Sequence, residues 1–350
     1  MRKPKRFITP AIRPASSFER EVLTQPRALS RVLTVYSRPH QSPLLRSTIS
    51  NPPSSILFLG IGSSLYAALP AVCHLNRHGV FAEAQDASEY LYYGGQLRCD
   101  ALPVLISQSG ESPEVNKIAR QLSRPWIAVT NNPRSTLAKS ALVVLPILAA
   151  KETGTTNQTY TNTIVVCLAL AARIGGTHDF VPKQIPGLMK QLLQNWRAKI
   201  EPVADFLGDT AHLDIFARGP SLATALQGAL ILRELTHIKT SPFSAGQFRH
   251  GPLASAKERA TAIGIAPRGP TQTLTLRLAA DIVNQGGSVV LLTNKKLKTS
   301  RNWVIVPTPA LDEQDAPLYD ILFFELLGIL LAERRGMIPG GDVIKITTKE

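Results

Sequence analysis

The chain has 350 residues, 44% of them hydrophobic, and a formal net charge of +14. This length and apolar content suit about two domains with buried cores. No apolar run approaches the roughly 18 residues that span a bilayer, and the basic start contains no apolar segment typical of a secretion signal. We therefore expect a cytoplasmic protein with no membrane contact.

The positive charge is concentrated at the start of the chain. Residues 1–50 hold ten Arg or Lys residues and two Glu residues, a net of +8. Residues 1–25 are interpreted as a basic N-terminal arm in solvent, and the alternative is a contact with nucleic acid. Because few aromatic residues that could stack on bases are interleaved with these charges, no nucleic-acid partner is expected.

Strand-like runs alternate with helical patterns, which is typical of an α/β fold with largely parallel sheets flanked by helices. The first half contains predicted strands at 55–60, 102–107, 126–131 and 142–147. The second half contains predicted strands at 213–218, 261–267, 288–294 and 303–308.

The two halves repeat one plan. Matching strands lie about 157–163 residues apart, VTNNP (129–133) matches LTNKK (292–296), and ASEY (87–90) matches AGQF (245–248). We expect two tandem units, at 26–185 and 186–350, with a linker and a helix around 175–205 joining them.

Two loops of the first half are rich in small polar residues. Strand 55–60 runs into IGSS, with Ser63 and Ser64 expected at the cap of a helix, and strand 102–107 runs into SQSGES (107–112). Ligands of parallel sheets bind beyond the carboxyl ends of the strands, where helix N-termini offer N–H groups to anions. The alternative is a pair of serine-capped surface loops, but their occurrence together favours a phosphate site without a metal. The equivalent stretch ARGPS (217–221) has fewer hydroxyl groups, so one phosphate site per chain is expected.

The chain resembles the sugar isomerase (SIS) domain family, and most closely the isomerase half of the glucosamine-6-phosphate synthases. The resemblance runs from residue 18 to the C-terminus. It is carried by GIGSS (60–64), SQSGESPE (107–114), ARGPSLATALQGALILRELTHI (217–238), SPFSAGQFRHGPLA (241–254) and DVIKITTKE (342–350).

The resemblance implies two SIS units in a homodimer, a sugar-phosphate ligand and no cofactor or metal. It implies Glu234 as the proton-transfer base, His250 as the ring-opening residue given across the interface, and Lys345 as the Schiff-base lysine. The phosphate ligands that it implies are Ser63, Ser64, Ser107, Gln108, Ser109 and Ser112.

The residues themselves leave alternatives open. Moving a proton between C1 and C2 of a sugar needs a carboxylate base, and Ile231 beside Glu234 would raise its pKa. Glu234 could instead pair with Arg233 or Lys239 on the surface, and His250 could be a structural loop residue. Nothing local marks Lys345.

Some residues depart from the synthase pattern. A glutaminase domain is missing from this chain, and Gln227 and Ile231 stand where the synthase has a glutamate and a lysine. The loop TTNQT (155–159) lacks the lysine of its counterpart. We expect an isomerase or deaminase acting on an amino-sugar phosphate such as glucosamine 6-phosphate or fructose 6-phosphate. The alternatives are a deglycase of phosphorylated glycated amines and a sugar-phosphate sensor without turnover.

Overall fold

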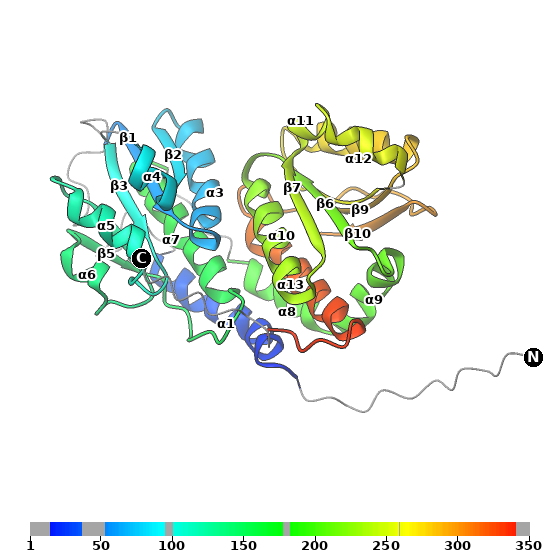
Figure 1. Ribbon diagram of the computed structural model, residues 1–350, viewed down its shortest axis with the longest axis horizontal. Coiled ribbons are helices and arrows are strands. Elements are labelled where there is room, and N and C mark those ends of the chain that lie inside the picture. The colour runs from blue at the N-terminus through cyan, green and yellow to red at the C-terminus, as the bar shows by residue number, and fades with distance from the viewer. Residues whose placement is uncertain (1–14, 37–52, 95–100, 178–182, 259, 341–350) are drawn as a thin grey trace, which may run out of the picture.

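The computed structural model describes residues 15–36, 53–94, 101–177, 183–258 and 260–340 (Figure 1). In these residues two five-stranded sheets have the orders β2-β1-β3-β4-β5 and β10-β9-β8-β6-β7. Every neighbouring pair of strands is parallel. Counted from β6, the second sheet has the same order as the first. The predicted α/β fold of two tandem units is therefore confirmed.

Each predicted strand is present, with its boundaries moved by at most one residue. The strands are β1 (Ser55–Gly60), β2 (Phe81–Asp86), β3 (Ala101–Ile106), β4 (Ile127–Thr130), β5 (Val143–Pro146), β6 (His212–Ala217), β7 (Lys239–Ser244), β8 (Thr261–Ala266), β9 (Ser288–Thr293) and β10 (Trp303–Pro307).

The helices connect and cover these strands. They are α1 (Ser17–Tyr36), α3 (Ser63–Arg77), α4 (Ala87–Tyr93), α5 (Pro113–Gln121), α6 (Thr136–Ser140), α7 (Gln158–Ile174), α8 (Ile185–Leu193), α9 (Trp196–Leu207), α10 (Leu222–Thr236), α11 (Ala245–Phe248), α12 (Gln272–Asn284) and α13 (Ala316–Arg334), with short 3-10 helices η1 (Gly219–Ser221) and η2 (Pro252–Glu258). The helix expected after the linker is two helices, because Asn195 takes a left-handed φ of 56° between α8 and α9.

One hydrophobic core lies between the sheets. It joins one face of each sheet to α1, α3, α7, α10 and α13, and α7 and α13 are buried along almost their whole length. Separate clusters cover the outer faces, under α4, α5 and α6 on the first sheet and under α11 and α12 on the second. Figure 1 shows this succession of layers from one side of the molecule to the other.

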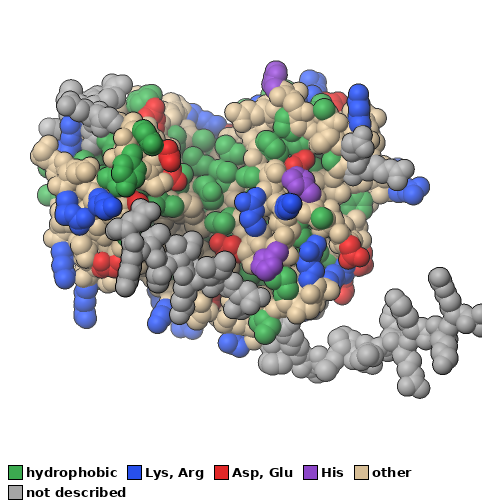
Figure 2. Space-filling view, in the orientation of Figure 1, with side chains coloured by type: hydrophobic (Ala, Val, Ile, Leu, Met, Phe, Trp, Pro, Cys, Tyr) green, Lys and Arg blue, Asp and Glu red, His purple; other side chains and the backbone are tan. Residues whose placement is uncertain are grey.

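The two units meet through α3 and α10, which pack against each other. Figure 2 shows hydrophobic side chains gathered where the two halves meet on this face of the molecule. The contact is polar further along, where Arg77 of α3 pairs with Glu313 and Gln314 Nε2 donates to Pro70 O at 2.7 Å. No helix in the described part of the chain has the length and apolar character to cross a membrane.

Candidate functional site

The first sheet changes direction between β1 and β3. The chain passes from β1 through α3 to β2 on one side, and then returns to β3 on the other side of β1. In sheets of this order ligands bind at that switch point, beyond the carboxyl ends of the two strands. Both serine-containing loops leave these strands, which pair as far as Leu59 with Leu105. The fold therefore places the two loops at one edge, as the sequence predicts.

The loop after β1 turns at Gly62, whose φ is 54°. Gly62, rather than a serine, precedes the first helical residue of α3, and no side chain caps this helix. The Ser64 N–H is also not free, because it donates to Ile61 O at 3.2 Å. The predicted serine cap is therefore wrong. Ser63 and Ser64 are instead half-buried residues of the first helical turn, so their hydroxyl groups are not used as caps.

The loop after β3 is organised by Ser107, which is 3% exposed. Its Oγ accepts a hydrogen bond from Gly110 N at 3.1 Å and shares another with Ser112 Oγ at 2.8 Å. Gln108 and Ser109 are exposed, and Ser109 Oγ accepts from Glu111 N at 3.1 Å. Ser107 and Ser112 thus hold the loop together, while Gln108 and Ser109 face solvent.

Hydrogen bonds from α5 and α6 also fix the loop after β3. Gly110 O accepts from Leu137 N at 3.1 Å and from Asn116 Nδ2 at 3.2 Å. The Glu111 carboxylate accepts from Thr136 N at 2.9 Å, and this hydrogen bond lowers the pKa of Glu111. The loop is therefore fixed to α5 and α6 and is preorganised before any ligand arrives.

Glu234 is half-buried on α10. Burial raises its pKa, and the Thr155 side chain opposes the rise by favouring the charged form. Thr155 Oγ1 is buried, and no group in the described structure lies within hydrogen-bonding distance and angle of it. Glu234 is therefore the partner that its pKa effect indicates. No ion pair joins Glu234 to Arg233 or Lys239 within the described residues, and the Arg233 guanidinium donates to Thr240 O instead. Glu234 therefore lies in a setting that suits a proton acceptor.

The segment that carries Thr155 is fixed by two carboxylates. Glu152 Oε1 accepts from the backbone N–H groups of Asn157 at 3.1 Å and Thr159 at 2.9 Å. Glu21 of α1 accepts from Thr153 N at 3.0 Å, from Thr153 Oγ1 at 2.7 Å and from Asn157 Nδ2 at 3.1 Å. The position of Thr155 beside Glu234 thus depends on a helix more than 100 residues earlier in the chain.

The turn of α10 that carries Glu234 approaches the start of α3. Tyr66 lies one turn beyond Ser63, where burial and then the Asp86 carboxylate raise the pKa of its hydroxyl and the Arg233 charge opposes the rise. Nearer the start of α10, Gln227 and Ile231 are fully buried, and neither the oxygen nor the nitrogen of the Gln227 amide has a hydrogen-bond partner in the described structure. The interface between α3 and α10 therefore brings the neighbourhood of Glu234 towards the first serine loop.

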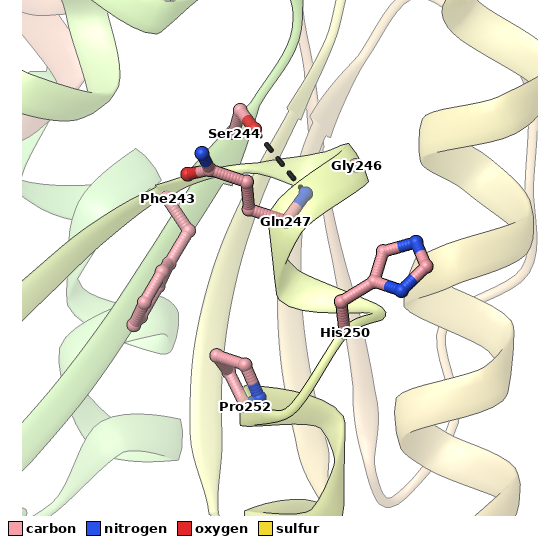
Figure 3. Close-up of a pocket in the computed structure, with 6 residues that line it drawn as sticks. All are labelled: Phe243, Ser244, Gly246, Gln247, His250 and Pro252. Carbon is pink, nitrogen blue, oxygen red and sulfur yellow. Dashed lines mark hydrogen bonds between the residues drawn. The ribbon is translucent and has the colours of Figure 1, made fainter.

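His250 lies apart from these groups. Its exposed side chain lines an open pocket of about 670 Å³, and no hydrogen bond joins it to Glu234 or to the loop serines in the described part of the chain. The other lining residues are Phe243, Ser244, Gly246, Gln247 and Pro252. Figure 3 shows the His250 ring directed away from Phe243. Lys345 lies outside the described residues.

The structure also contains polar groups that the sequence did not single out. Thr155 beside Glu234 could have been noticed as part of the TTNQT loop, but nothing in the sequence indicated which residue it contacts. Tyr66 and Arg233 are ordinary helix residues that come within electrostatic range because α3 packs on α10. No group of three or more His, Cys, Asp or Glu side chains in the described residues could hold a metal ion.

These observations define an α/β protein with a candidate ligand site at the switch point of its first sheet. The SIS domain family model matches residues 49–173 and 206–302, more than half of the chain. The chain belongs to the SIS domain family.

Several known proteins are similar to this chain. Glutamine–fructose-6-phosphate aminotransferase of Rhizobium leguminosarum is 28% identical in an alignment that covers 93% of this chain and 56% of the relative. The chain thus spans about half the length of such curated relatives.

Solved structures share the fold. The C-terminal domain of glucosamine-fructose-6-phosphate aminotransferase from Francisella tularensis matches with a TM-score of 0.82 and 20% identity, over 93% of this chain and 98% of that one. Glucosamine-6-phosphate deaminase from Thermotoga maritima matches with a TM-score of 0.74 and 19% identity, over 93% and 97% of the two chains.

Proposed function

We propose that this protein is a cofactor-free isomerase or deaminase of an amino-sugar phosphate such as glucosamine 6-phosphate or fructose 6-phosphate. The observation that carries the proposal is the setting of Glu234. It is a half-buried carboxyl with a raised pKa, on a helix that packs against α3, which begins at the β1/β3 switch point. Two similar proteins are named for fructose 6-phosphate and for glucosamine 6-phosphate, and these names support the same substrate class.

In the proposed mechanism the first unit holds the phosphate. Ser64 and Ser109 donate hydrogen bonds to it, and the N-terminus of α3 contributes a favourable dipole. Ser63, Gln108 and Ser112 complete the set, and Ser107 shapes the loop. Binding at this fixed point would direct C1 and C2 of the open-chain sugar towards Glu234.

Glu234 then moves one proton between the two carbons. With glucosamine 6-phosphate it takes the proton from C2 and returns it to C1, while a second proton passes from the C2 amine to the C1 oxygen, which gives a C2 imine and a C1 alcohol. Water adds to the imine, ammonia leaves, and fructose 6-phosphate remains. With a ketose substrate the same proton transfer interconverts ketose and aldose.

Two further residues are assigned on the family resemblance. His250 of a second subunit would assist ring opening, which agrees with its exposure and with its place beyond the far end of β7, which follows the helix of Glu234. Lys345 would form a Schiff base with the open-chain carbonyl and draw electrons from the reacting carbons. The His250 role requires a homodimer, and the Lys345 role requires the C-terminal segment near the site.

A sensor without turnover is the second candidate. It is favoured by the face of α10 that leads to Glu234, where Gln227 is neutral and Ile231 is apolar. A pocket of this kind could bind a sugar phosphate and lack the charges needed for rapid proton transfer. A deglycase of phosphorylated glycated amines would use the same groups with a bulkier leaving amine.

Exchange of carbon-bound hydrogen with solvent separates these candidates. In deuterium oxide the wild-type protein should introduce deuterium at C1 or C2 of fructose 6-phosphate or glucosamine 6-phosphate, detected by NMR. Released ammonia then distinguishes deamination from isomerisation. Glu234→Gln should bind the sugar phosphate normally and lose exchange by about 100-fold or more. Tight binding by the wild type without exchange would support the sensor and reject the enzyme.

A further inference from the structure

The second unit repeats the turn that forms the candidate phosphate site of the first. Gly219 follows β6 with a φ of 55°, and Gly62 follows β1 with a φ of 54°. Gly62 stands just before α3, and Gly219 is the first residue of η1, which leads directly into α10. The space between the ends of β6 and β8 is therefore the counterpart of the switch point between β1 and β3.

The two switch points differ in what lies beside the glycine. A Cβ atom at Gly62 would meet nothing within 4 Å, which leaves open space. A Cβ at Gly219 would lie 3.8 Å from Glu313 Oε2, and one at Gly269, in the loop after β8, would lie 2.5 Å from the same oxygen. Glu313 is only 6% exposed. Its carboxylate thus lies against both loops of the second switch point.

The surroundings of Glu313 favour a negative charge. Arg77, at the end of α3, forms an ion pair with it across the unit boundary. The start of η1 and α10 contributes the positive end of a helix. The next residue, Gln314, is fixed by a hydrogen bond of 2.7 Å to Pro70 O in α3. A carboxylate that is buried in this way needs such compensation to remain charged.

We propose that Glu313 is a built-in anion that fills the ligand crevice of the second unit. Each chain therefore takes a single phosphorylated ligand, in the first unit, and the second crevice instead fastens α3 to the second unit. Inorganic phosphate or a phosphomonoester enters the second crevice only when the Glu313 side chain is removed. This inference extends the proposed function, because it supposes that the first unit binds the phosphate.

The test measures inorganic phosphate binding by calorimetry in a chain whose first-unit loops carry Ser64→Ala and Ser109→Ala. In this background Glu313→Ala and Glu313→Ser should each tighten phosphate binding about tenfold or more, since Arg77 and the helix start become available. Glu313→Gln, which keeps the volume of the side chain, should give no such gain. Asp312→Ala is the matched control, because Asp312 is an exposed neighbour paired with Arg268.

Removing Glu313 leaves Arg77 without its partner, so stability provides a second measurement. Thermal unfolding of Glu313→Ala should shift upwards with phosphate but not with chloride at equal ionic strength. Adding Arg77→Ala should abolish most of the phosphate effect. If Glu313→Ala and Glu313→Ser respond to phosphate no more than Asp312→Ala does, in binding and in stability, the proposal is wrong. Because the background lacks the first-unit serines, this result is independent of whether the wild-type protein is an enzyme.

Discussion

The Glu234 carboxyl is a weaker acid than an exposed glutamate because burial penalises its charged form. A general base must be ionised before it accepts a proton, so turnover should fall as the pH drops through this raised pKa. In the pH profile of kcat, the midpoint of the fall on the acid side should therefore lie above the pKa of about 4.3 that glutamate has in peptides. We call this fall the acid limb.

Thr155→Val should move this acid limb to higher pH. The Thr155 side chain lowers the pKa of Glu234, and its loss leaves the desolvation unopposed. The measurement is kcat against pH with the substrate that passes the exchange assay. Thr156→Val, at the next position, should leave the limb in place. An unchanged limb in Thr155→Val, or a shift to lower pH, would contradict the assigned contact.

Mutations of the serines in the loop after β3 should have two different effects, one on ligand binding alone and one on both binding and stability. Ser109 is exposed, so Ser109→Ala should weaken sugar-phosphate binding by about 1–3 kcal/mol and leave stability nearly unchanged. Ser107 holds Gly110 N and Ser112 Oγ, so Ser107→Ala should lower both binding and the free energy of unfolding. Calorimetry and urea denaturation measure the two quantities, with the exposed Ser140→Ala as control. Equal affinity for the phosphorylated and unphosphorylated sugar would reject the phosphate site.

This division of roles could not be predicted from the sequence. SQSGES contains three serines with similar local context, and only the packing of the loop on α5 and α6 decides which of them are enclosed. The location of the loop was predictable, because an apolar strand before it and Pro113 at the first turn of a helix after it both have clear signatures. Pro113 is indeed at the start of α5.

At the scale of elements, two edge strands, β2 and β7, were not predicted, while the interior strands and the edge strands β5 and β10 were. β1 and β4 are buried throughout and appear as apolar runs. β2 and β7 lie at the edges of their sheets, and their sequences FAEAQD and KTSPFS contain polar residues and, in β7, Pro242. Proline is tolerated on an edge strand because its missing N–H is not needed there. Their pairing with β1 and β6 is what identifies them as strands.

At β2 and β7, the sequence similarity between the two units predicted the local structure better than the hydrophobic pattern of the strands did. ASEY and AGQF both open short helices directly after the edge strands, and each is capped by the residue before it. The Asp86 carboxylate accepts from Ser88 N and Glu89 N, and Ser244 Oγ accepts from Gln247 N. A cap that recurs at the same place in both units is a physical reason for the sequence similarity.

Gly110 allows a prediction about the whole loop between β3 and α5. Its φ is 68°, and a Cβ there would lie 2.0 Å from Ser135 Oγ and 2.4 Å from Ser135 Cβ. Gly110→Ala should therefore displace the loop, reduce sugar-phosphate binding strongly and lower the free energy of unfolding. Gly79→Ala is the matched control, since Gly79 has a φ of 78° with nothing within 4 Å.

The control should lose only the cost of a left-handed alanine, about 1–2 kcal/mol, and should bind normally. Urea denaturation and calorimetry on both variants provide the comparison. If the two variants lose equal stability and both bind the ligand, the close contact with Ser135 has no influence on the loop.

At the scale of the molecule, the units share one core rather than two. The central cluster contains residues from both sheets and from α1, α3, α7, α10 and α13. We therefore expect a single cooperative unfolding transition in calorimetry, with the calorimetric and van't Hoff enthalpies in agreement. Two resolved transitions would show that the units unfold separately. Helix α1 runs without a break through residue 25 and buries Phe18 and Val22 in this core, so the solvated arm expected at 1–25 does not extend to residue 25. The division at residue 185 stays a prediction, and limited proteolysis can locate flexible boundaries.

Shared sites between two subunits would be visible in mixtures of inactive variants. If His250 serves the partner's site, Glu234→Gln and His250→Ala should each be inactive, and mixing them should restore part of the activity after subunit exchange. The restored fraction should depend on the mixing ratio, since only mixed dimers contain an intact site. A monomer in sedimentation, or no recovery in proven mixed dimers, would exclude this arrangement.

Helix α1 is the first described helix in the chain, yet it packs on α7, α8 and α13. Gln25 Nε2 donates to Glu325 Oε1 at 3.0 Å across 300 residues of sequence. On a ribosome that adds about 5–20 residues per second, α1 waits roughly 15–60 seconds before its last partner is synthesised. During that time its apolar face, with Phe18, Val22 and Leu29, lacks part of the surface that covers it in the folded protein. Production of this protein should therefore depend on chaperones that shield its first helix until the last one emerges.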